Sequence, residues 1–99
     1  MGISVEVRTY TGAVEARCVH PSVADLCGRA AGRNLPMLGH VDPLDDTVFN
    51  RSQLSVLVPE LRALVDGSAA EEAEAAREIL ALTAQVERRA HRYLVFNGD

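Results

Sequence analysis

The stretch from Asn50 to Gly67 constrains the fold most, because it specifies the start, the buried face and the end of a helix. Asn50 and Gln53 have the spacing of a capping box, in which each side chain accepts from the backbone N–H of the other residue. Phe49 and Leu54, which flank this cap, have the spacing of a hydrophobic staple. Gly67 is the residue type that most often ends a helix. Between the two ends, apolar residues recur as on one buried helix face: Leu54, Leu57, Val58, Leu61, Leu64 and Val65.

Pro59 lies inside this apolar stripe. It has no N–H to donate to the carbonyl of Ser55, which predicts a kink here; a new helix that begins near Pro59 is the alternative. After a short turn, Ser68 and Glu71 have the spacing of a second capping box, and a long alanine-rich helix is expected from there to about Arg89. The two helices should form a hairpin. The inner face of the second helix is predicted to be Ala76, Ile79, Leu80, Thr83, Val86 and Ala90.

A β-hairpin is expected at the N-terminus, where residues 3–10 and 14–18 alternate between apolar and polar side chains. A two-residue loop is favoured, because its register pairs opposite charges on one face and leaves the other face apolar. A three-residue loop with a bulge is the alternative, and it would place Arg8 opposite Val14. The favoured register pairs Arg8 with Glu15, Glu6 with Arg17, and Val5 with Cys18.

Residues 22–41 are predicted to form a short helix followed by a strand. Ser22 and Asp25 have cap spacing, and Gly32 ends an apolar stripe that consists of Val23, Leu26, Cys27 and Ala30. Residues 37–41 are expected to form a strand that pairs back on residues 47–49 across an acidic turn.

The C-terminal segment 93–96 is apolar on both faces, which is typical of a strand inside a sheet. Residues 97–99 are expected to be its frayed end. The patterns together predict one α+β domain over residues 1–99. Its small mixed sheet contains the N-terminal hairpin, short middle strands and a central C-terminal strand, packed with a short helix and a helical hairpin in the C-terminal half.

Composition narrows the class of protein. The net charge is −4 and all ten basic residues are arginine, so general nucleic-acid binding is not expected. Cys18 and Cys27 lack the spacing of a zinc or redox motif and fall on apolar positions, which indicates reduced core cysteines in a cytoplasmic protein. No secretory signal and no membrane-spanning run is recognised. We expect a protein partner and no cofactor.

The clearest candidate for function is the acidic turn that begins at Asp42-Pro43, because three carboxylates gather just before a short apolar segment. Carboxylates displayed on a fixed turn steer a basic partner. The first hypothesis is therefore a small acidic binding protein, such as an immunity- or antitoxin-like inhibitor. Its partner-binding residues would be Asp42, Asp45, Asp46 and Glu60.

The alternative is a small enzyme or sensor that binds a metal or other ligand through His40, Asp42 and Asp46, since imidazole and carboxylates are metal ligands. The spacing of an EF-hand is absent, and no acid, base and nucleophile share a neighbourhood, so no catalytic residue is assigned. A basic cluster around His91 could receive a phosphate or an acidic partner. A homodimer, built across a strand edge or along the alanine-rich helix, is a third hypothesis.

Two segments resemble known proteins. Residues 38–50, with Asp42-Pro43 and Asp46-Thr47-Val48-Phe49-Asn50, and residues 91–99, with Tyr93-Leu94-Val95-Phe96-Asn97-Gly98-Asp99, are similar to a group of small, functionally uncharacterised actinobacterial proteins. The resemblance covers about a third of the chain. It implies that the acidic turn and the C-terminal strand are the defining parts, and it implies no activity.

Overall fold

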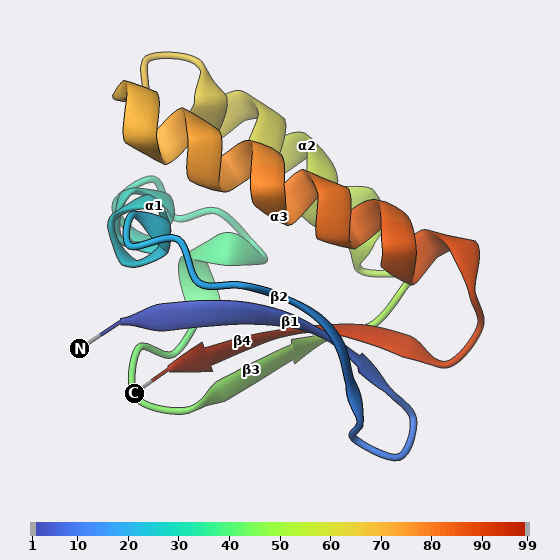
Figure 1. The fold of residues 1–99 in the computed structure, drawn as a ribbon. Coiled ribbons are helices and arrows are strands. Elements are labelled where there is room, and N and C mark those ends of the chain that lie inside the picture. Colours follow the sequence, from blue (N-terminus) through green and yellow to red (C-terminus); the bar gives the residue numbers. More distant parts are fainter. Residues whose placement is uncertain (1, 99) are drawn as a thin grey trace.

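A four-stranded sheet carries two helices on one face and a third helix at one end (Figure 1). The computed structural model describes residues 2–98. The strand order is β2-β1-β4-β3 and every pairing is antiparallel, so the predicted α+β fold is confirmed, with an antiparallel rather than a mixed sheet. In chain order the elements are β1 (Ile3–Thr9), β2 (Val14–Cys18), α1 (Val23–Gly32), the 3-10 helix η1 (Leu38–His40), β3 (Asp46–Phe49), α2 (Leu54–Val65), α3 (Ala70–Arg88) and β4 (Arg92–Gly98).

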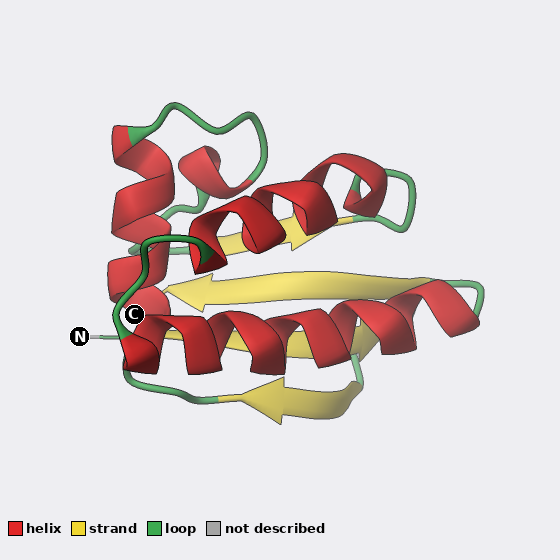
Figure 2. Cartoon of the chain, turned by 90° about the horizontal axis from the view of Figure 1, so that it is seen from above, coloured by secondary structure: helices red, strands yellow, loops and turns green. Residues whose placement is uncertain are grey.

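The helices cover only one face of the sheet. Seen from above, α3 lies over the β2 side of the sheet and α2 over the β3 side (Figure 2). The covered face supplies the core, in which the rings of Phe49 and Phe96 pack edge to face with their centroids 5.7 Å apart. We call the other side of the sheet, which no helix covers, the open face (Figure 1). No helix in residues 2–98 is both long and apolar enough to span a membrane.

The N-terminal hairpin combines the two predicted registers. Glu6 lies opposite Arg17 as predicted, but a bulge places Arg8 opposite Val14. The expected pair of Arg8 with Glu15 is therefore wrong. Glu15 instead accepts two hydrogen bonds from Arg92 of β4, at 2.6 and 3.0 Å.

The short helix α1 is confirmed, with its predicted stripe buried. The strand predicted for residues 37–41 is wrong, because residues 38–40 form η1 and β3 pairs with β4 instead. The carboxylate of Glu60 explains η1, since it accepts the backbone N–H groups of Met37 (3.1 Å) and Leu38 (2.9 Å). Gly39 lies close to α1: a Cβ atom at this position would be 3.2 Å from the carbonyl oxygen of Ala30.

The capping box predicted before α2 forms, but α2 begins only at Leu54, with Gln53 rather than Asn50 in the cap position and a turn over residues 51–53. Asn50 N–H donates to Gln53 Oε1 (2.8 Å) and Gln53 N–H donates to Asn50 Oδ1 (2.9 Å), which is the predicted capping box. Phe49 and Leu54 are both buried, as the staple requires. Pro59 lies inside one continuous helix, so the alternative of a second helix starting there is wrong.

The start of α3 differs from the prediction. Ala69 occupies the cap position, and Ser68 makes no cap hydrogen bond. The Ser68 hydroxyl donates to the carbonyl of Leu64 and accepts from Arg29 (2.6 Å), so it connects α2 to α1. The two helices do pack together. Most of the predicted inner face is buried, but Ala90 is exposed because α3 ends at Arg88.

The C-terminal strand β4 lies between β1 and β3, which confirms its predicted central place. The frayed end predicted for residues 97–99 is wrong for Asn97 and Gly98. Both belong to β4, where Asn97 lies opposite Ser4 and Asp46. Asp99 lies outside the described residues.

Candidate functional site

The acidic loop, residues 42–46, connects η1 to β3 and is held by bonds between its own side chains and backbone. The backbone N–H of Leu44 donates to Asp42 Oδ1 at 2.9 Å, which is an Asx turn. The N–H of Asp46 donates to Asp45 Oδ1 at 2.8 Å. Two of the three carboxylates therefore shape the loop and each keeps its second oxygen for other contacts.

The sheet also holds this loop. Asp42 N–H donates to Thr47 Oγ1 (2.9 Å), and Gly98 N–H donates to the Asp45 carbonyl (3.0 Å). Gly98 packs directly on the loop: a Cβ atom there would be 2.5 Å from the carbonyl oxygen of Asp42 and 2.5 Å from the carbonyl carbon of Pro43. Only glycine allows this approach without a shift of the backbone.

The loop displays an apolar side chain among charges. The side chains of Asp42, Asp45 and Asp46 are exposed, and Leu44 between them is 67% exposed. Val48, two residues beyond Asp46 on the open face of β3, is 55% exposed. These five residues form what we call the loop surface.

An ion-pair network on the open face reduces the charge of the loop surface. Asp46 pairs with Arg8 at 3.1 Å, Arg8 pairs with Glu6 at 2.6 Å, and Glu6 pairs with Arg17 at 2.7 Å. Burial raises the pKa of the Glu6 carboxyl, but the hydrogen bonds and charges of the two arginines outweigh this and hold that pKa below its usual value. Within residues 2–98, Asp42 and Asp45 have no such cationic partner.

Glu60, predicted as a further partner-binding residue, does not belong to this surface. It is 7% exposed, and its carboxylate oxygens accept the backbone N–H groups that start η1. A buried carboxylate needs hydrogen-bond donors, and here the backbone of residues 37 and 38 supplies them. We assign Glu60 a structural role.

The predicted metal set of His40, Asp42 and Asp46 is not assembled. Asp46 pairs with Arg8, and these three residues do not converge on a common point. In the described part of the chain, one group of at least three His, Cys, Asp or Glu side chains has all its donor atoms within 4.8 Å of one another: His20, Glu74 and Glu78.

The group of His20, Glu74 and Glu78, which we call the His20 cluster, was missed by the sequence analysis. His20 Nε2 lies 3.8 Å from Glu74 Oε1, and His20 Nδ1 accepts the backbone N–H of Ser22 at 3.1 Å. The buried thiol of Cys18 donates to Glu78 Oε1 at 3.4 Å. The four-residue spacing of the two glutamates was the available signal, but nothing in the sequence placed β2 beside them.

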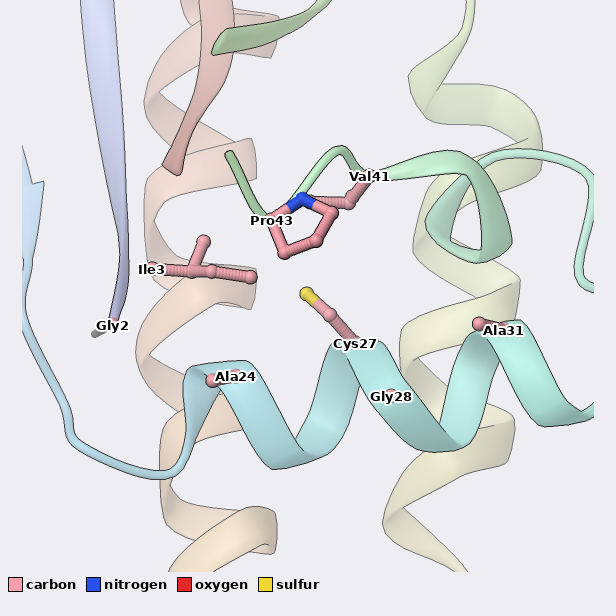
Figure 3. Close-up of a pocket in the computed structure, with 8 residues that line it drawn as sticks. All are labelled: Gly2, Ile3, Ala24, Cys27, Gly28, Ala31, Val41 and Pro43. Atoms are coloured by element: carbon pink, nitrogen blue, oxygen red, sulfur yellow. The ribbon is translucent and has the colours of Figure 1, made fainter. Parts of the chain in front are cut away.

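An apolar cavity of about 290 Å³ lies between α1, the start of β1 and the segment 41–43. The sulfur of Cys27 points into it, toward Ile3 and Pro43 (Figure 3). Burial raises the pKa of the Cys27 thiol to about 12, so the thiol stays protonated and unreactive at neutral pH. The cavity offers apolar surface and no group for catalysis.

The basic cluster near His91 is partly neutralised. The guanidinium of Arg92 is bound to Glu15, while Arg88 and Arg89 are exposed at the end of α3. The ring of His91 stacks edge to face with Tyr10, with the centroids 5.9 Å apart. One arginine of this cluster is therefore not available to an anion.

Comparison of the chain with protein-family models, with curated protein sequences and with solved structures finds no match. The resemblance to small actinobacterial proteins stays a prediction.

Proposed function

We propose that this protein is a small binding protein that captures a basic protein partner with its loop surface, in the manner of an immunity- or antitoxin-like inhibitor. The observation that carries the proposal is Leu44, an apolar side chain that is 67% exposed at the tip of a loop fixed from both sides. Burying such a side chain against a partner contributes about 1.5–3 kcal/mol.

Charge determines which partner fits. Asp42 and Asp45 flank Leu44 and have no arginine partner in the described chain, so a partner must bring positive charge to this surface. Complementary charge accelerates association at low salt and excludes acidic competitors. Because the loop is already held by Gly98 and its own side chains, little conformational entropy is lost on binding.

The backbone of β3 supports the same location. β3 is the last strand in the sheet order, so its outer edge has no strand partner within residues 2–98. An unpaired edge beside an exposed apolar side chain is a common docking position for an extended segment. A second copy of this chain could use that edge as well, and its test is sedimentation at several concentrations.

The experiment compares matched variants in capture from an extract of the source cell. The loop variant carries Asp42→Asn, Leu44→Ser and Asp45→Asn, because asparagine keeps the Oδ1 acceptors that shape the loop. The control carries Glu71→Gln and Glu87→Gln, which remove the same charge from exposed sites on α3. Asp46 is left unchanged because it pairs with Arg8.

We expect a basic protein to be captured by the wild type and the control but not by the loop variant. With that protein purified, its association rate should fall steeply as salt rises for the wild type and weakly for the loop variant. Equal capture by all three proteins, with the same salt dependence, would refute the proposal.

A further inference from the structure

The His20 cluster joins the segment after β2 to the first half of α3. Glu74 and Glu78 are four residues apart on α3, so their carboxylates lie on the same helix face, and His20 faces both. All three donor atoms lie within 4.8 Å of one another. We propose that His20, Glu74 and Glu78 bind a divalent transition-metal ion, and that this ion is Zn²⁺.

The two carboxylates of this cluster form no ion pair with arginine within residues 2–98. Two glutamates at this helical spacing repel each other, which destabilises a helix unless a positive charge lies between them. In residues 2–98, no arginine lies within ion-pair distance of either carboxylate, although Arg77 lies between them in the sequence of α3, and His20 Nε2 is 3.8 Å from Glu74. Four other acids of the described chain, Glu6, Glu15, Asp46 and Glu72, form ion pairs with arginine.

The geometry allows a metal to bind after small side-chain movements. Tetrahedral Zn²⁺ holds nitrogen and oxygen ligands at about 2.0–2.2 Å, which puts neighbouring donor atoms roughly 3.3 Å apart. The donors therefore have to approach one another by at most about 1.5 Å, and His20 Nε2 and Glu74 Oε1, at 3.8 Å, by about 0.5 Å. The side chain of Glu74 is 62% exposed and can rotate, whereas the His20 side chain is 11% exposed and is held in place. Water would occupy the remaining position.

The donor set selects the ion. One imidazole with two carboxylates suits a first-row transition metal, whereas Mg²⁺ and Ca²⁺ prefer oxygen ligands alone. Affinity at such sites is higher for Zn²⁺ than for Mn²⁺ or Fe²⁺; Cu²⁺ binds more tightly still, but it prefers square-planar or tetragonal geometry. Zn²⁺ should therefore bind where millimolar Mg²⁺ or Ca²⁺ does not.

Binding has one identifiable cost. The hydrogen bond from Ser22 N–H to His20 Nδ1 leaves the imidazole proton on Nε2, the atom that faces Glu74. A metal on Nε2 moves that proton to Nδ1, so the Ser22 bond is lost. The loss of one neutral hydrogen bond corresponds to roughly a fivefold weaker affinity. It also provides a signature, since the Ser22 amide changes its environment only if His20 is a ligand.

Cys18 has a supporting role. Its buried thiol donates to Glu78 Oε1 at 3.4 Å and so orients this carboxylate toward the cluster. Cys18 is not one of the three residues whose donor atoms all lie within 4.8 Å of one another, so we assign it as a positioning residue for Glu78 rather than as a ligand.

The test adds Zn²⁺ to protein that has been stripped with a chelator and kept reduced. We expect one Zn²⁺ per chain by calorimetry, and a melting temperature that rises by roughly 10–20 °C at free Zn²⁺ one hundred times the dissociation constant. The variants Glu74→Gln and Glu78→Gln should each weaken binding at least tenfold. The controls Glu71→Gln and His40→Asn should bind as the wild type does.

The Ser22 amide gives an independent measurement by ¹H–¹⁵N spectroscopy. Its resonance should shift, and its hydrogen exchange should accelerate, when one equivalent of Zn²⁺ is added to the wild type. If the protein with both glutamates changed binds Zn²⁺ as tightly as the wild type, or if the Ser22 amide does not respond, the proposal is wrong. Both glutamates lie on the exposed surface of α3, so the variants are expected to fold.

Discussion

The tightest packing at the candidate site is between Gly98 and the acidic loop, and it predicts a large effect of a single methyl group. In the variant Gly98→Ala, the new Cβ would lie 2.5 Å from the carbonyl oxygen of Asp42 and 2.6 Å from that of Pro43. Ordinary carbon contacts are about 3.5–4.0 Å, so the loop has to move by about 1 Å. Backbone atoms cannot rotate away as the end of a side chain can.

The magnitude follows from two contributions. Inserting a methyl group into a close-packed site costs about 1–3 kcal/mol, and weakening the bond from Gly98 N–H to Asp45 adds up to about 1 kcal/mol. We expect the free energy of unfolding to fall by about 2–3 kcal/mol in urea denaturation, which lowers the melting temperature of a chain of this size by roughly 10–20 °C.

Gly28→Ala is the matched control. Gly28 lies inside α1, and a Cβ atom there would have no other atom within 4 Å. The same substitution should therefore stabilise the protein by about 0.5–1 kcal/mol, because alanine loses less conformational entropy in a helix. The two variants thus separate local crowding from the general effect of replacing glycine.

The loop should report the change directly. In ¹H–¹⁵N spectra, the amides of residues 42–48 should shift in Gly98→Ala and stay in place in Gly28→Ala. Partner capture should also weaken in Gly98→Ala, although none of the side chains of the loop surface has changed. If Gly98→Ala matches the wild type in stability and its loop amides do not shift, the loop is soft, and its rigidity cannot support the proposed binding.

Three further predictions concern buried groups. Glu60→Ala should lower the free energy of unfolding by about 3 kcal/mol, because two backbone N–H groups of η1 lose a charged acceptor; urea denaturation and hydrogen exchange at η1 measure this. Glu6→Gln should be less stable than the wild type by about 2 kcal/mol at pH 7. Arginines hold the pKa of Glu6 in the folded protein below its usual value of 4.5. The difference in stability between the two proteins should therefore be constant above pH 4.5 and disappear as the pH falls through the lower pKa of the folded state. Denaturation curves between about pH 7 and about pH 3 measure this. The Cys27 thiol, whose pKa burial raises to about 12, should react with a thiol reagent at pH 8 only as fast as the protein unfolds.

Local patterns in the sequence predicted the elements whose specification is local. The capping box at Asn50 and the stripes of α1 and α2 depend on residues within one or two turns, and the structure confirms them. The central place of β4 followed from its two apolar faces. The hairpin was predicted, and its bulge follows the alternative register; the favoured pair of Arg8 with Glu15 was wrong, and Glu15 binds Arg92 of a strand far along the chain instead.

Two of the errors involve partners that are distant in sequence. Residues 38–40 form η1 because Glu60 accepts its N–H groups, and a carboxylate 22 residues away leaves no periodic trace. Ser68 has the spacing of a cap, but Arg29 of α1 and the carbonyl of Leu64 occupy its hydroxyl. A spacing rule therefore identifies a possible hydrogen bond, whereas tertiary neighbours decide whether it forms.

The distribution of arginine shows why the two proposed surfaces lie where they do. Buried or crowded acids on the sheet and on α3 are paired with arginines, as Glu6, Glu15 and Glu72 are. The acids left without an arginine in residues 2–98 include Asp42 and Asp45 of the loop at one edge of the sheet and the two glutamates of the His20 cluster at the opposite edge. Both lie toward the end of the sheet where β1 begins and β4 ends (Figure 1). Because like charges near one end of a small domain oppose folding, an external cation or cationic surface would stabilise each group. A metal ion fits the cluster that contains an imidazole, and a basic protein fits the loop that contains an exposed leucine.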